Sequence, residues 1–433
     1  MKVHHFPPVE GITEEQKEEF LLAIATTFDS TWLESKSNAE HPLKKLWNRE
    51  DFLAGLELMC LGDAILKVEK IDKIWLTERV NDIKVSNQNY HGYMFELMCI
   101  SMLATGGMKV RPSSGNAPGV DAIINFDDGF EVFASIKNHD LSENERFFRE
   151  RSRSARKKAI DHLRQLGKPA VTVIDAHEYL TKSEWDKVEK TIEKFRSISF
   201  HDNLIEAVKG KAWVNIFPLT PFDGYNEFAS QYFSDTFLSV SAKHKNEQHN
   251  FESKVSKASD NLRKHRSSLE NCANVIIMKV HASADINELA KYATELLNNE
   301  ESLANISGII FYQTQVVKHG EQTAIAHHTQ TALPNGSSLG KHPLNISPLF
   351  GVISNAQPRN ILTSSNHETI DLSTRYTYQA GDHYYIAKMV NGEMRGNVGY
   401  LGPGMHAHAV FEINGVPGIF QGKLPKEETL VVM

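Results

Sequence analysis

Three ionisable side chains in the first third of the chain have the types and spacing of a site that acts on a phosphodiester. Glu96 is the one charged residue in the apolar run from 93 to 103. Asp121 opens a strand-like segment, and Lys137 ends the next one. A carboxylate in such a helix must be paired, hydrogen-bonded or bound to a metal, because desolvating it alone costs several kcal/mol. Acids beside a lysine can hold a metal ion and place a positive charge next to a phosphate.

The segment from Tyr90 to Ala176 must position these residues. Its pattern predicts a buried helix from 90 to the glycine pair at 106–107, strands at 108–111, 120–126 and 130–137, a basic helix from 143 to about 166, and a buried strand at 169–175. Because side chains alternate along a strand, Ser135 and Lys137 share the face that can meet Asp121. We therefore expect helix, three strands, helix and strand to form one unit.

The chain then echoes this order. A strand at 237–243 ends in Ser241-Ala242-Lys243, as the earlier strand ends in Ser135-Ile136-Lys137, and a basic helix to about residue 266 and a strand at 274–280 follow. The second unit is either a degenerate repeat of the first or a chance match, since Ser-x-Lys is a common pattern. No aspartate precedes the second copy in a hairpin, so a true duplicate would be inert.

The fold class predicted is multi-domain α/β, of the α+β kind, because 433 residues exceed what one hydrophobic core usually serves. Apolar residues at helical spacing from about 13 to 84 predict a helical N-terminal region. The predicted domains are this region (1–88), the αβββαβ unit (89–210), a second α/β domain (211–318) and a β-rich C-terminal domain (319–433). Frequent proline and glycine after residue 320 indicate the short strands of the last domain.

The bulk composition excludes several classes of protein. The net charge of −7 argues against a general nucleic-acid coat, although a local basic groove can still attract phosphates. Three cysteines at wide spacing exclude a disulfide framework and a four-cysteine zinc site, and a reducing cytoplasm fits them best. No run approaches the roughly 18 apolar residues that a membrane span needs. We therefore predict a cytoplasmic protein without a membrane partner.

The helix with Glu96, the segment Pro118-Gly119-Val120-Asp121 and the strand that ends in x-x-Lys137 resemble the PD-(D/E)xK nuclease superfamily, which has the restriction-endonuclease-like fold. The resemblance covers residues 90–175. It implies that Asp121 is a Mg²⁺ ligand, that Lys137 positions the attacking water or stabilises charge on the phosphate, and that Glu96 is an auxiliary ligand, directly or through a water. Mg²⁺ prefers oxygen ligands and keeps several waters, one of which can be the nucleophile.

One position departs from the family pattern. Ser135 stands two residues before the lysine, where the family has glutamate, aspartate or glutamine, and a hydroxyl adds no charge to a Mg²⁺ site. Some restriction enzymes of this fold bring the missing carboxylate from the following helix, which implies Glu150 here, with Glu145 and Glu143 as alternatives. An active site therefore requires Glu96, Asp121, Lys137 and one such acid to converge within about 6 Å of one point.

The predicted basic helix after Lys137 has two interpretations. It can line a groove that binds the nucleic-acid backbone with salt-sensitive affinity. It can also be a solvated face, because acids interrupt its positive run. The candidate backbone-binding residues are Arg146, Arg149, Arg153, Arg156 and Lys157.

A second constellation lies near the C-terminus. His406, His408 and Glu412 match half of the cupin metal motif, and two histidines at this spacing face one way on a strand. No histidine follows Glu412 as the fourth ligand, so two ordinary strand histidines are the simpler interpretation.

The leading hypothesis is a nuclease dependent on Mg²⁺ or Mn²⁺ that hydrolyses DNA. The family analogy adds a restriction or phage-defence role, with a homo-oligomer or a larger defence complex as the assembly. The alternative is an inactive nuclease-like protein that binds nucleic acid or a partner protein. A metal enzyme of the C-terminal domain is the third hypothesis.

Overall fold

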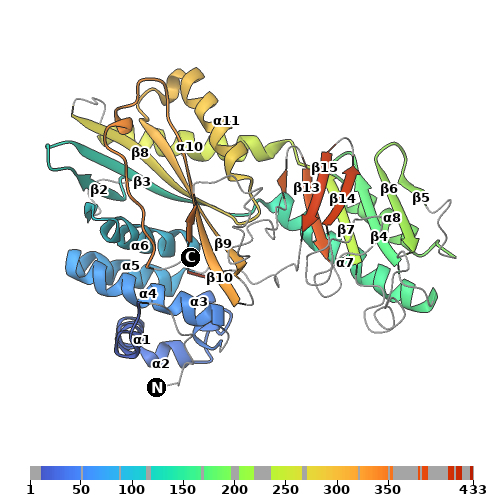
Figure 1. The fold of residues 1–433 in the computed structure, drawn as a ribbon, viewed down its shortest axis with the longest axis horizontal. Helices are drawn as coiled ribbons and strands as arrows, with labels where there is room; N and C mark the ends of the chain where they lie inside the picture. The colour runs from blue at the N-terminus through green and yellow to red at the C-terminus, as the bar shows by residue number, and fades with distance from the viewer. Residues whose placement is uncertain are drawn as a thin grey trace, which may run out of the picture.

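The computed structural model describes residues 11–49, 52–86, 89–113, 119–166, 170–196, 204–218, 236–265, 271–319, 322–349, 352–354, 379–380, 383–388, 408–413, 416–421 and 430–432. Two mixed β-sheets organise these residues, and Figure 1 shows them as two bodies side by side. The multi-domain α/β class predicted from the sequence agrees with this mixture of helices and sheets at the coarse level. None of the described helices has the length and apolar character needed to cross a membrane.

The N-terminal region is helical, as predicted. Its helices are α1 (Glu14–Phe28), α2 (Ser30–Glu34), α3 (Pro42–Trp47), α4 (Phe52–Ile71) and α5 (Lys73–Val85), and α6 (Tyr90–Thr105) follows them. A capping box fixes the start of α1, since Thr13 accepts a hydrogen bond from the backbone of Gln16 and the Gln16 side chain accepts one in return. The apolar helix α6 is buried along most of its length, because helices and a sheet cover it.

The seven-stranded large sheet has the order β1-β2-β3-β8-β9-β10-β11. These strands are β1 (Lys109–Pro112), β2 (Ala122–Asn125), β3 (Glu131–His139), β8 (Cys272–Val280), β9 (Gly308–His319), β10 (Gln322–Ala332) and β11 (Val352–Ser354). The first three strands pair antiparallel, and β8 joins β3 in parallel. The described 3₁₀ turns η1 (Glu301–Leu303) and η2 (Ser338–Gly340) also belong to this part of the chain.

The large sheet lies between two layers of helices (Figure 1). Val132, Ala134 and Ile136 of β3 pack into the core shared with α4 and α6. The opposite face carries Phe133 and packs on α10 (Asn246–His265) and α11 (Ile286–Asn299). The alternation predicted along β3 therefore gives the strand two different apolar faces.

The six-stranded small sheet has the order β12-β13-β7-β4-β6-β5. Its strands are β12 (Gln379–Ala380), β13 (His383–Lys388), β7 (Thr236–Ala242), β4 (Ala170–Ala176), β6 (Ala212–Pro218) and β5 (Leu204–Val208). Helices α7 (Glu143–Leu166) and α8 (Lys182–Ile192) pack on it around Phe148 and Trp185. A separate hairpin joins β14 (His408–Ile413) to β15 (Val416–Gln421).

The expected closure of the first unit by the helix at 143–166 and the strand at 169–175 is wrong. Both elements form where predicted, but α7 and β4 belong to the small sheet, and the strand beside β3 is β8. The boundaries 89–210, 211–318 and 319–433 consequently each include parts of both sheets. Each of the basic helices α7 and α10 is followed by an apolar strand, β4 or β8. The residues of neither strand specify its partner, because parallel pairing joins segments that are far apart in the sequence.

Candidate functional site

Asp121 lies just before β2, and its carboxylate is held by the end of β3. Its Oδ2 atom accepts hydrogen bonds from the backbone N–H of Ile136 at 2.6 Å, from Lys137 Nζ at 2.9 Å and from Ser135 Oγ at 3.4 Å. The backbone N–H of Asp121 also donates to Ala134 O at 2.8 Å. The hairpin register therefore brings together the aspartate, the serine and the lysine that the sequence analysis selected.

The loop before Asp121 fits closely under α10. Gly119 has φ +96°, and a Cβ atom there would lie 2.3 Å from Cβ of Asn261 on α10. A side chain at this position would be strained by the backbone conformation and by the contact. The glycine of the Pro118-Gly119-Val120-Asp121 segment thus lets α10 pack against the aspartate loop, while Pro118 itself lies outside the described residues.

Glu96 of α6 belongs to the same electrostatic cluster. Burial raises the pKa of Glu96 to about 7, and the negative charge of Asp121 adds to the increase, while Arg79 and Lys137 oppose it. Arg79 Nη2 lies 3.0 Å from the Glu96 carboxylate, and its guanidinium stacks over the rings of Trp75 and Tyr93. Glu96 is consequently close to half-protonated at neutral pH, beside a carboxylate that is held by a lysine.

Ser135 is fully buried and supplies a hydroxyl to Asp121. The acids expected to compensate lie on α7, which packs on the small sheet. Glu145 is buried and accepts two hydrogen bonds from Arg149, at 3.1 Å from Nε and 2.7 Å from Nη2. Glu143 and Glu150 are exposed. The hydrogen bonds of Asp121 described above come from Ser135, Ile136 and Lys137, so the convergence of an α7 acid on the site stays a prediction.

The helix that does face the site is α10, and it brings a lysine. Lys254 Nζ donates to Asn138 O at 2.8 Å, directly beyond Lys137 on β3. Burial lowers the pKa of Lys254, and the positive charges of Arg146, Lys137 and Lys257 lower it further, against the opposite effect of Asp140. The sequence pattern places this helix in the second unit, and it therefore does not predict Lys254 as a residue of the site. If β8, which begins at Cys272, had been predicted to pair with β3, the helix before it, α10, would have been predicted to cover the site.

The basic residues of α7 are divided between two environments. Arg149 is buried against Glu145, so it is not on an exposed groove. Arg146, Arg153 and Lys157 are exposed, and Arg156 is half-buried. The exposed face also carries Glu143, Glu150 and Asp161 in alternation with these bases. This mixture matches the solvated-face interpretation more closely than a continuous basic groove.

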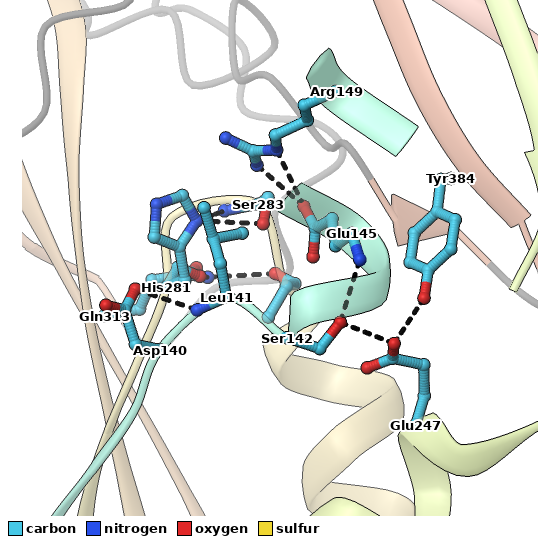
Figure 2. A network of polar contacts seen from close by, with 11 residues as sticks. Asp140, Leu141, Ser142, Glu145, Arg149, Glu247, His281, Ser283, Gln313 and Tyr384 are labelled. Carbon is cyan, nitrogen blue, oxygen red and sulfur yellow. Dashed lines mark hydrogen bonds and ion pairs between the residues drawn. The ribbon is translucent and has the colours of Figure 1, made fainter. Parts of the chain in front are cut away.

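A cavity of about 480 Å³ lies at the junction of the two sheets, where the chain crosses from β3 to α7 and from β7 to α10. This junction cavity is lined by residues 139–142 and 145, 242–245, 247, 248 and 251, 281, 284 and 285, and 288, 289 and 292. Figure 2 shows the polar network that joins the two crossings: Ser142 Oγ donates to Glu247 Oε1 at 2.5 Å, and Tyr384 of β13 donates to the same oxygen. Glu247 of α10 therefore links both sheets.

Two histidines beside the junction cavity are neutral at physiological pH. Burial lowers the pKa of His139 to about 4 and that of His281 to about 3, and nearby cations add to both shifts. His281 Nδ1 lies 2.9 Å from Ser283 Oγ, and Gln313 donates to the His281 carbonyl at 2.7 Å. The Nδ1 atom of His139 is buried and has no hydrogen-bond partner among the described residues. This atom is closed to solvent, so a hydrogen bond from His139 to a molecule in the cavity would have to use the other ring nitrogen.

The donor set at Asp121 suits a hard cation. The described residues contain no group of three His, Cys, Asp or Glu side chains arranged to hold a metal. Asp121 and Glu96 nevertheless offer two carboxylates, and Mg²⁺ is commonly held by one or two carboxylates together with waters and substrate phosphates. Of the cupin-like residues, His406 lies outside the described residues, while His408 and Glu412 are positions of β14.

Comparison of the chain with protein-family models, with curated proteins and with solved structures finds no match. The function therefore has to be argued from the residues and their geometry.

Proposed function

We propose that this chain is a Mg²⁺-dependent nuclease (Mn²⁺ can replace Mg²⁺) that hydrolyses phosphodiester bonds of DNA at Asp121, Glu96 and Lys137. The observation that carries the proposal is the 2.9 Å pair of Asp121 and Lys137 beside a partly buried Glu96. The order α6-β1-β2-β3, then α10 and the parallel strand β8, supports it. This order resembles the helix, three strands, helix and strand of the restriction-endonuclease-like fold, with a later helix and strand than the sequence suggested.

The residues divide the chemistry between them. Asp121 and Glu96 would hold the metal ion, which activates a water and polarises the phosphate. Lys137, which donates to Asp121 at 2.9 Å, would supply the positive charge that stabilises the charge developing on the phosphate. Ser135 keeps Asp121 oriented through its hydroxyl and adds no ligand charge. Lys254 supplies a second positive charge on the opposite wall, from α10.

A specific observation favours a second candidate function, nucleic-acid binding without cleavage. Asp121 already has three hydrogen-bond donors, and α10 brings a lysine, Lys254, to the carbonyl of Asn138 near the end of β3. Such a site can bind a phosphate through Lys137 and Lys254 without activating a water. The same geometry would then serve a binding module of a larger complex, with a nucleic acid or a protein as the partner.

Cleavage assays separate the two functions. Purified protein is incubated with Mg²⁺ or Mn²⁺ and with labelled single-stranded and duplex DNA and RNA, and Asp121→Asn serves as the matched variant. The proposal expects cleavage of DNA by the wild-type chain and none by Asp121→Asn. Intact substrates with salt-sensitive binding would instead support the second function.

The proposed role in restriction or phage defence, in the cytoplasm, rests on the activity. Cells that carry the gene should resist phage better than cells that carry the Asp121→Asn variant. Equal protection by the two would separate the biological role from the proposed cleavage. Chromatography of the purified protein, with and without DNA, would then test assembly as a homo-oligomer or within a larger complex.

A further inference from the structure

The junction cavity lies directly beside the proposed phosphodiester site. Lys137 and His139 project from the same face of β3, and two residues of strand separate them by roughly 6.6 Å. On the opposite wall, Lys254 and Phe251 are one turn apart on α10, about 5 Å along the helix. Lys254 contacts the backbone at Asn138, and Phe251 makes an edge contact with the ring of His139. Lys254 and Phe251 of α10 therefore lie against two consecutive residues of β3, Asn138 and His139.

This arrangement has the spacing of a nucleotide. The two lysines suit a phosphate, and the neighbouring aromatic pair suits the base that the same nucleotide carries. We propose that the junction cavity holds an unpaired nucleobase whose phosphate lies at Lys137 and Lys254, so that the substrate is single-stranded nucleic acid. The inference rests on the proposed function and names its substrate class. A base stacked inside a duplex could enter the cavity only after being flipped out, at a cost of a few kcal/mol.

The walls of the cavity have the chemistry that a base requires. Phe251, Leu289 and Tyr292 provide apolar and aromatic surface, and a volume of about 480 Å³ is within the range of small-ligand pockets. His139 lines the cavity, and its neutral imidazole ring can offer a hydrogen bond to the polar edge of a base. Gln248 and Lys243 also line the cavity. Stacking on aromatic side chains is tolerant of sequence, as expected for a general single-strand site.

The acids of the cavity do not oppose an anionic ligand as strongly as their number suggests. Asp140 lies 3.7 Å from Arg146, and Glu145 is paired with Arg149. Glu247 accepts hydrogen bonds from Ser142 and Tyr384, as Figure 2 shows. Asp285 caps the N-terminus of α11 through the backbone N–H groups of residues 287 and 288. Each of these four carboxylates thus has a cation or hydrogen-bond donors of its own, and the fifth acid that lines the cavity, Glu288, is exposed on α11.

Binding measured in EDTA tests the inference independently of cleavage. Fluorescence anisotropy would compare a short labelled single strand, a blunt duplex and a mononucleotide with the wild-type chain and with Leu289→Trp, which fills the cavity. We expect Leu289→Trp to weaken single-strand binding about 10-fold and to leave duplex binding unchanged. Glu295→Trp adds the same side chain at an exposed position of α11 outside the cavity and should change neither.

His139→Phe gives a second test, because it keeps the aromatic contact with Phe251 and removes the ring nitrogens. We expect about 5-fold weaker binding of the single strand, from the loss of one hydrogen bond to the base. Circular dichroism of each variant checks that it folds. Wild-type single-strand affinity in both variants would overturn the inference. Loss of mononucleotide binding alone, with strand binding unchanged, would also overturn it and would make the cavity a free-nucleotide site.

The two possible failures are distinguishable. Absence of cleavage with Mg²⁺, together with cavity-dependent strand binding in EDTA, would contradict the proposed function and leave the base-binding cavity in place. Cleavage that depends on Asp121 but is unaffected by Leu289→Trp, with equal affinity for single strands and duplexes, would support the proposed function and contradict the base-binding cavity.

Discussion

Strands β3 and β7 end in the same pattern and have different surroundings. Each has Ser-x-Lys at or near its C-terminal end, with β3 continuing to His139 and β7 ending at Ala242, and each is followed by a long helix and a strand. The followers are exchanged: β4, which comes after β3, pairs in parallel with β7, and β8, which comes after β7, pairs in parallel with β3. Strand β3 thus lies beside the strand that follows β7 in the sequence, and β7 lies beside the strand that follows β3. Whether this reflects an ancestral duplication stays a prediction.

The two serines show what makes the difference between a site and an ordinary strand end. Ser135 donates to the Asp121 carboxylate, which the β2–β3 hairpin places beside β3. Ser241 donates instead to the backbone carbonyls of Glu178 and Ala242, both at 3.3 Å. The Ser-x-Lys pattern thus forms a candidate site only where the neighbouring antiparallel strand places a carboxylate within hydrogen-bonding distance of the serine and the lysine.

The largest expected effect comes from removing one lysine at a time. Lys137→Ala should lower the rate of DNA cleavage by about 100-fold to 1000-fold, because it removes the positive charge nearest the phosphate. Lys209→Ala removes an exposed lysine between β5 and β6 of the small sheet, outside the cavity, and should leave the cleavage rate within about 3-fold. Single-turnover kinetics with saturating enzyme measure both. Equal losses in the two variants would mean that Lys137 has no special role at the end of β3.

A pH profile tests the role of Glu96. Its pKa of about 7 means that the carboxylate is mostly protonated below pH 7 and ionised above it. Only the ionised form can hold a metal, so the cleavage rate at limiting Mg²⁺ should rise about 10-fold per pH unit below pH 7 and level off above it. Arg79→Gln removes a charge that lowers this pKa and should move the midpoint upward. A profile unchanged by Arg79→Gln would argue against Glu96 as a ligand.

The smallest effect compares two glycines with positive φ. Gly119→Ala must accommodate φ +96° and a Cβ contact with Asn261, whereas Gly210→Ala, between β5 and β6, has φ +67° and open space around its Cβ position. We expect Gly119→Ala to lower the free energy of unfolding by about 2 kcal/mol more than Gly210→Ala, owing to the overlap. Urea denaturation measures the difference. Equal losses would mean that α10 does not pack tightly on the Asp121 loop.

The local elements of the site could be predicted from sequence, and its long-range partners could not. The helix around Glu96 and the hairpin from Asp121 to Lys137 follow from apolar periodicity and turn residues, which are local signals. The choice between β4 and β8 beside β3 depends on contacts across more than a hundred residues, for which neither strand has a local signal. Lys254 was missed for the same reason. The pairing of Glu145 with Arg149 was foreseeable, since residues four apart on a helix face each other.

The central claim is that Asp121 and Glu96 hold a catalytic divalent metal ion without an acid at position 135. Mn²⁺ titration followed by electron paramagnetic resonance, with a non-cleavable phosphorothioate single strand bound, tests it most directly. The account predicts that the wild-type chain binds Mn²⁺ and that Asp121→Asn weakens this binding at least about 100-fold, while Asp161→Asn on the exposed face of α7 does not. Mn²⁺ affinity that is absent from the wild-type complex, or equal in wild type and Asp121→Asn, would contradict the account.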